Sequence, residues 1–162
     1  MSETSPTDQP QADQQPAMRV LLQYLKDLSF ESPSAPDALR ANLPSPEVEV
    51  SVDVNARRLG NDQYEVELAC NATSTREGQP VFVVEANYAG LFMIQNVPED
   101  QMEPLLLVEA PRLLFPFARQ IVANATKEGG FPPLLLEPLD FGGMYRMQRE
   151  RAAQGIAPNG NA

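Results

Sequence analysis

Apolar and polar residues alternate in four segments of the chain. The clearest is 47–54, where every second residue is valine and the residues between are Glu, Glu, Ser and Asp. Successive side chains of a strand point to opposite faces of a sheet, so this pattern predicts a strand with one apolar and one acidic face. The segments 23–31, 64–72 and 80–94 have the same period and are predicted to be strands as well.

Short turns join the last three predicted strands. The turn signals are Gly-Asn-Asp at 60–62 and Arg-Glu-Gly at 76–78. Consecutive strands joined in this way pair antiparallel. The first strand is followed by the proline-rich segment 32–37, which is too long for a tight hairpin. The pattern therefore predicts a four-stranded antiparallel sheet.

The two faces of this sheet are expected to differ in charge. In the first strand, a period of two places Tyr24, Leu28 and Phe30 on one face together with Lys26, and Leu25 on the other. The acidic face collects Asp27, Glu31, Glu49, Asp53, Glu65, Glu67 and Glu85. Alternation by itself predicts such a solvated sheet surface. The second interpretation is that this acidic face is a docking surface for a basic partner.

A long helix is predicted to follow the sheet, starting at the acidic residues 99–100. Pro111 and Pro116 lie within it. A proline in a helix interior removes a hydrogen bond and costs about 3 kcal/mol, so the helix is expected to be bent. Residues 129–138 form a stiff apolar connector, and 140–151 form a short second helix. The predicted fold class is α+β, with this helix pair covering one face of the sheet.

The long helix carries apolar residues on more than one side. Leu106, Ala110, Leu113, Phe117 and Ile121 recur at helical spacing, and Val108, Phe115 and Val122 occupy a different side. A single sheet with one long and one short helix leaves this surplus without a covering layer. Either a second subunit or a ligand is expected to cover it.

Composition narrows the function classes. The chain has 162 residues and a formal charge of −10, which disfavours binding to nucleic acid. Histidine is absent, so imidazole bases and imidazole metal ligands are absent too. Cys70 is the only cysteine, which excludes an intrachain disulfide and a cysteine metal cluster, and it is expected to pack in the core. No cofactor, no metal and no catalysis are predicted.

Polar segments flank the predicted domain. Residues 1–17 and 152–162 are expected to be disordered tails, with the folded domain at 18–151. The first residues are polar and acidic, unlike a signal peptide. No apolar run reaches the roughly 20 residues that span a membrane. We therefore expect a cytoplasmic protein without direct membrane insertion.

Three stretches of the chain resemble the SecB family of protein-export chaperones. The first is Tyr-Leu-Lys-Asp-Leu-Ser-Phe-Glu at 24–31. The second is Tyr-Ala-Gly-Leu-Phe at 88–92, and the third is 111–145, which contains Leu-Phe-Pro-Phe-Ala-Arg and Gly-Phe-Pro. The resemblance runs from about 23 to 145, which is most of the predicted domain. It implies a SecB-like arrangement of sheet and helices.

The resemblance also implies partners. Members of this family form homotetramers, which are dimers of dimers. They hold unfolded secretory precursor proteins without ATP and deliver them to the motor SecA. The sheet's acidic face contacts the basic, zinc-bearing tail of SecA, and the zinc belongs to that partner. Matched onto this sequence, the SecA-binding residues are Asp27, Glu31, Val83 and Glu85.

Two further groups of residues are assigned roles. The resemblance implies that Val84, Ala86 and Tyr88 take part in subunit assembly. We expect a groove for unfolded clients between the connector, the long helix and the segment after Glu31. Its predicted lining is Phe30, Phe131, Leu134 and Leu136, for each of which plain core packing is an equally good interpretation.

Two other functions stay open at this point. The same fold suits a chaperone dedicated to a single partner, such as a toxin–antitoxin pair, which would bind one client and not SecA. A small enzyme that uses carboxylates of the acidic face is the other. Such an enzyme requires acids clustered in a cleft with raised pKa values, whereas alternating strand acids indicate an open surface.

Overall fold

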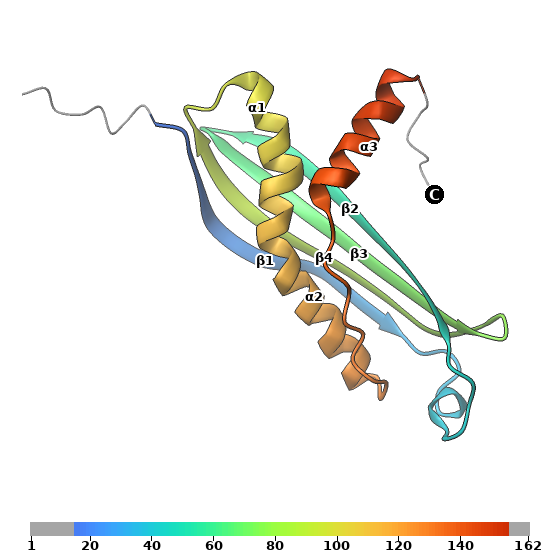
Figure 1. Cartoon of the computed structure of the whole chain (residues 1–162). Coiled ribbons are helices and arrows are strands. Elements are labelled where there is room, and N and C mark those ends of the chain that lie inside the picture. The colour runs from blue at the N-terminus through green and yellow to red at the C-terminus, as the bar shows by residue number, and fades with distance from the viewer. Residues whose placement is uncertain (1–14, 156–162) are drawn as a thin grey trace, which may run out of the picture.

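The computed structural model describes residues 15–155 and consists of one antiparallel sheet with helices on one face (Figure 1). The strands are β1 Ala17–Glu31, β2 Glu47–Gly60, β3 Gln63–Arg76 and β4 Gln79–Gln95. Their order in the sheet is β1-β4-β3-β2, so β1 and β2 form the two edges. This confirms the predicted four-stranded antiparallel sheet. A short 3₁₀ turn, η2 Asp37–Leu39, lies in the proline-rich connection between β1 and β2.

Two register shifts make β1 differ from its predicted pattern. They lie between Val20 and Leu22 and between Leu25 and Asp27. Directly opposed residues of antiparallel strands share a face, so Tyr24, opposite Ala89, lies on the acidic face. The prediction that Tyr24 and Lys26 share a face with Leu28 is therefore wrong. Each extra residue at a bulge reverses the phase of the alternation.

Leu25 also lies on the other face from the one predicted. It lies opposite Tyr88, on the face that the helices cover, although a strict period of two placed it on the acidic face. The strand also starts at Ala17, earlier than predicted, because the apolar residues 20–22 continue the pairing with β4.

The predicted long helix is present as three joined segments. They are α1 Glu99–Pro104, the π-helical η3 Leu105–Glu109 and α2 Ala110–Glu128. Pro111 has no amide hydrogen to donate to the preceding turn. The amide of Ala110 donates instead to the carbonyl of Leu105, five residues back, which is the π-helical pattern. The predicted long helix thus contains a π-helical segment just before Pro111, whereas Pro116 lies inside α2 without ending it. The bend expected from the two prolines stays a prediction.

The second helix, α3 Phe141–Ala153, begins at the N-cap Asp140, whose carboxylate accepts from the amide of Gly143 at 2.9 Å. It extends to Ala153, beyond the predicted domain end at residue 151. The disorder predicted for the tails falls partly on 1–14 and 156–162, which lie outside the described residues.

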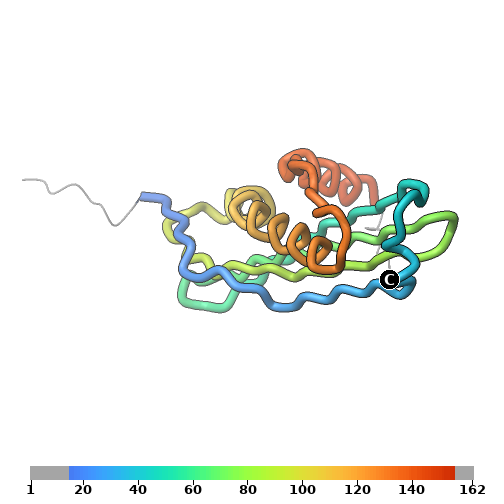
Figure 2. Tube along the Cα trace, turned by 90° about the horizontal axis from the view of Figure 1, so that it is seen from below, coloured from blue at the N-terminus to red at the C-terminus, as the bar shows by residue number. Residues whose placement is uncertain are grey.

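The core lies between α2 and the two central strands, and the helices are all on one side of the sheet (Figure 2). Leu114, Ala118 and Val122 are buried on the sheet side of α2. A Cβ at Gly90 of β4 would lie 2.9 Å from Leu114 Cδ2, so glycine at this position allows the helix to approach the strand closely. By contrast, Leu113 and Phe117 remain 46% and 50% exposed.

One long helix covers only the centre of this face and leaves two apolar margins. The β1 margin consists of Leu25, Leu28, Leu113, Phe117 and Ile121, and the β2 margin consists of Val48, Val50, Val52, Leu134, Leu135, Met144 and Met147. Of the helix residues predicted to need a covering layer, Leu113 and Phe117 stay exposed in the β1 margin. Those on the other predicted side, Val108, Phe115 and Val122, are buried within this chain.

Candidate functional site: an acidic sheet face and two apolar margins

The uncovered face of the sheet brings together the four residues predicted to bind SecA. Opposed pairs place Ser29 beside Glu85 and Glu31 beside Val83, with Asp27 one row further along β1. Asp27, Glu31 and Glu85 are exposed. Within residues 15–155, none of these three carboxylates forms an ion pair. They form a compact acidic patch across β1 and β4.

Another part of the same face is electrically balanced. Glu65 is only 6% exposed and accepts hydrogen bonds from the Tyr24 hydroxyl, from Arg57 Nε at 2.9 Å and from Lys26 Nζ at 3.1 Å. The bonds from Tyr24 and then Arg57 hold the pKa of Glu65 at about 2, against the opposing effect of burial. Lys26 also pairs with Glu67 at 3.0 Å.

This network changes the picture of the acidic face. Two of the acids that the alternation assigned to it, Glu65 and Glu67, have basic partners. A strict period of two places Tyr24 and Lys26 on the opposite face, so the network could not be predicted from the sequence. The free carboxylates are therefore separated from the balanced ones along the strands.

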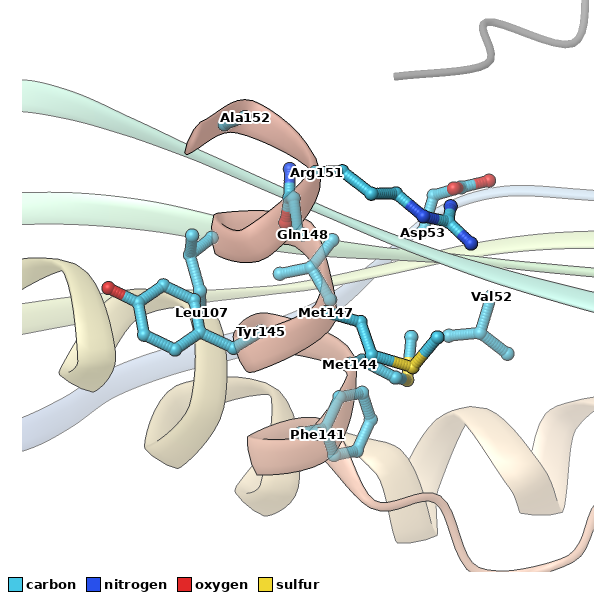
Figure 3. A pocket seen from close by; sticks show the side chains of 11 residues that line it. Val52, Asp53, Leu107, Phe141, Met144, Tyr145, Met147, Gln148, Arg151 and Ala152 are labelled. Carbon is cyan, nitrogen blue, oxygen red and sulfur yellow. The ribbon is translucent and has the colours of Figure 1, made fainter. Parts of the chain in front are cut away.

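The β2 margin contains two neighbouring hollows that share Val52 and Met144. One, of about 410 Å³, lies between β2 and α3. Figure 3 shows Met144 and Met147 extending from α3 toward Val52 of β2. The other, of about 470 Å³, lies between β2 and the connector, whose Leu135 is 58% exposed. Their linings are mainly apolar, and methionine side chains adapt readily to different partners.

The four predicted client-binding residues fall into two groups in the structure, and their role in client binding stays a prediction. Phe30 and Phe131 both contact Phe82, with ring centroids 5.9 and 5.0 Å away. Phe30 borders a third hollow of about 480 Å³ on the β1 side of α2, whereas Leu134 and Leu136 border the β2 margin.

The connector is fixed by two hydrogen bonds to α2. The amide of Leu134 donates to Thr126 Oγ1 at 2.9 Å, and Arg119 Nε donates to the carbonyl of Leu136 at 2.6 Å. Leu136 is 5% exposed, so it serves mainly the core. Its neighbour Leu135, which the sequence analysis did not single out, presents its side chain to solvent instead. The alternation of an extended backbone explains this difference.

The three residues assigned to subunit assembly lie beneath α2. Val84 and Ala86 are fully buried within this chain. Tyr88 is nearly buried and stacks on the exposed Phe117, with centroids 6.0 Å apart and planes 15° apart. Tyr88 thus contacts Phe117 of the β1 margin, and the role of the three residues in assembly stays a prediction.

The described residues offer little for catalysis or metal binding. Cys70 packs in the core, as expected. Its burial, and secondarily the charge of Asp53, raises the pKa of the thiol to about 11. Residues 15–155 contain no group of three or more Cys, Asp or Glu arranged to hold a metal ion. In the same part of the chain, no helix has both the length and the apolarity to cross a membrane.

Exposed apolar hollows on a well-packed scaffold, with a free acidic patch on the opposite face, define a protein that binds other polypeptides. Residues 11–152 match the family model described as "Preprotein translocase subunit SecB". The chain belongs to the SecB family, whose members are protein-export chaperones and not enzymes.

Relatives of known name agree with this assignment. The protein-export protein SecB of Maricaulis maris is 52% identical over 93% of this chain and 89% of its own. That of Azorhizobium caulinodans is 45% identical over 98% of this chain and 96% of its own. A SecB-like chaperone of Mycobacterium tuberculosis, solved with an antitoxin peptide, is 17% identical. It has a TM-score of 0.62 over 76% of this chain and 91% of its own, which supports the fold.

The Glu65 network gives a prediction about stability. Glu65→Gln removes the charge that accepts bonds from Tyr24 and Arg57, and should lower the free energy of unfolding by about 1.5–3 kcal/mol at neutral pH. The pKa of Glu65 is lowered on folding, so its contribution is complete above its ordinary pKa of 4.5 and is lost as the pH falls toward about 2. Denaturant unfolding at several pH values measures this.

Glu67→Gln is the matched control, because within residues 15–155 Glu67 forms an ion pair with Lys26 alone and is more exposed than Glu65. Its effect should stay below about 1 kcal/mol. Equal losses for the two variants, or a Glu65 effect that persists unchanged at pH 2, would contradict the network.

Proposed function

We propose that this protein is an ATP-independent holdase of the cytoplasm, which keeps secretory precursors unfolded and delivers them to SecA. The observation that carries the proposal is the β2 margin, where apolar side chains stay exposed beside a fixed connector. Membership of the SecB family supports it.

The mechanism is one of mass action. A protein that binds the unfolded chain and not the native one lowers the concentration of chain free to fold. Unfolded precursors expose apolar side chains on extended backbone. Such side chains would enter the hollows beside Leu135, Met144 and Met147. Their release needs no energy source, because either a competing partner or folding of the client removes the client from the hollow.

Assembly would strengthen this binding. We propose a homotetramer, arranged as a dimer of dimers, in which the β1 margin is covered by further copies of the chain. An edge strand with exposed Leu25 and Leu28, next to Phe117 on α2, favours association with a like surface. Several weak client sites on one assembly then act together through their effective concentration.

Delivery would use the other face of the sheet. The patch of Asp27, Glu31, Val83 and Glu85 offers free carboxylates to a basic segment, as expected for the tail of SecA. Complementary charge accelerates encounter and sets the orientation of a complex. Since the client margin and the acidic patch lie on opposite faces, a client and SecA can be bound at the same time.

Client holding is tested by Leu135→Asp. A charge at this exposed connector position should reduce retention of apolar client segments without disturbing the core. Denatured precursor is diluted into buffer with either protein and no nucleotide, and its folding is followed by fluorescence. The wild type should slow folding, and the variant should slow it about tenfold less at equal concentration. Equal slowing by both would place the clients elsewhere.

SecA delivery is tested by Asp27→Asn combined with Glu85→Gln. The loss of two free carboxylates should weaken SecA binding about tenfold in calorimetry and leave the slowing of precursor folding unchanged. Glu77→Gln combined with Glu150→Gln makes the same change of charge outside the patch and should bind SecA normally. Loss of SecA binding and client binding together would refute separate surfaces.

Assembly is tested by Phe117→Asp. This charge in the β1 margin should convert tetramers into smaller species, as measured by light scattering after size exclusion. Gln120→Asp, at an exposed position of the same helix, should leave the mass unchanged. A full-size assembly of the Phe117 variant would contradict the proposed interface.

A further inference from the structure

Two methionines of α3 lie in the β2 margin with much of their surface exposed. Met144 is 37% and Met147 is 55% exposed. Both line the hollow between β2 and α3, and Met144 also lines the hollow beside the connector. Figure 3 shows both side chains extending from α3 toward Val52. Their thioethers are therefore open to small molecules in solution.

The other methionines that the structure describes are better shielded. Met18, Met93 and Met102 are half-buried. The sulfur of Met93 also accepts a hydrogen bond from Arg19 Nη2 at 3.4 Å. Susceptibility to oxidation follows exposure, so a dissolved oxidant would reach the two thioethers of α3 before the others within residues 15–155.

Few other oxidisable side chains compete with these two. The sequence contains no tryptophan and no histidine, and Cys70 is its only cysteine. The reactive form of cysteine is the thiolate. Cys70 is fully buried, and this burial raises the pKa of its thiol to about 11, so the thiol stays protonated at neutral pH. An oxidant is therefore directed to the methionines of α3.

We propose that Met144 and Met147 form a reversible oxidation site, at which hydrogen peroxide converts both thioethers to sulfoxides and thereby weakens client binding at the β2 margin. The proposal rests on the holdase function and adds a means of regulating it. At each residue the sulfur donates an electron pair to one peroxide oxygen, an S–O bond forms and the O–O bond breaks. The sulfur is oxidised and the peroxide is reduced. The second oxygen takes up the proton of the first and leaves as water.

The chemistry of the hollow explains the expected loss of binding. Val52, Leu107 and Phe141 line it beside the two methionines and offer no side-chain hydrogen-bond donor. A sulfoxide is polar, and moving a polar group out of water without a hydrogen-bond partner is unfavourable. An oxidised side chain would therefore turn toward solvent. Apolar client side chains would then lose the adaptable apolar surface that methionine provides.

The exposure of the two residues also allows repair. Methionine sulfoxide is converted back to the thioether by sulfoxide reductases, with one enzyme for each epimer. Because both side chains are exposed in the folded protein, the reductases can reach them without unfolding the chain. The site can therefore be switched in both directions.

Hydrogen peroxide tests the proposal on the full-length protein. After treatment at neutral pH, peptide mass spectrometry should find sulfoxide at Met144 and Met147 before it appears at the half-buried methionines. The oxidised protein should slow the folding of a denatured precursor about fivefold less than the untreated protein, with an unchanged circular dichroism spectrum. Treatment with the reductases for both epimers and a dithiol should restore the slowing.

Matched double variants locate the effect. Met144→Leu combined with Met147→Leu keeps the margin apolar, so it should slow precursor folding as the wild type does, both before and after peroxide. Met93→Leu combined with Met102→Leu should remain as sensitive to peroxide as the wild type. Met144→Gln combined with Met147→Gln imitates the polarity of the sulfoxides and should slow folding about fivefold less without any oxidant.

Three results would overturn the oxidation site. The first is a wild-type protein that carries both sulfoxides and still slows precursor folding fully. The second is an equal loss after peroxide in the wild type and in the α3 leucine variant, and the third is a loss that accompanies unfolding of the protein. If any of these occurs while the untreated protein slows folding, the holdase function stands. If the untreated protein does not slow folding, the holdase function fails and its regulation fails with it.

Discussion

The structure depends on the packing of one helix, α2, over the centre of a four-stranded sheet. Leu114, Ala118 and Val122 seal this contact, and Gly90 allows the close approach. A single helix is too narrow to cover four strands, and α3 covers only part of β2. Two apolar margins therefore remain, one on each side of α2. These margins are a consequence of the fold's proportions.

The uncovered face of the sheet carries many charged side chains, but its paired and unpaired carboxylates lie in different places. Glu65 and Glu67 are neutralised by bonds from β1 and β2, which tie these two edge strands to β3. The remaining carboxylates are free at both edges of the same face. The acids that stabilise the sheet therefore differ from those proposed for SecA binding, and the margin proposed for clients lies on the opposite face from that patch.

Much of this architecture could be predicted from local patterns. The valine–acid alternation at 47–54 led directly to β2, and the helical spacing after residues 99–100 led to the long helix that the structure shows as α1, η3 and α2. The β1 bulges could not be predicted, because they depend on pairing with β4. They reversed the assignment of Tyr24 and Leu25, and with it concealed the Glu65 network. Leu135 was missed because the sequence does not reveal which of the alternating connector positions faces the core.

Hydrogen exchange with mass spectrometry, with and without a denatured precursor, tests the central claim that the two margins have different occupants. We expect slower exchange on client binding in β2 and in the connector at 134–139, with β1 unchanged because other copies of the chain are proposed to cover it. Protection that appears in β1 and not in β2 would contradict different occupants for the two margins.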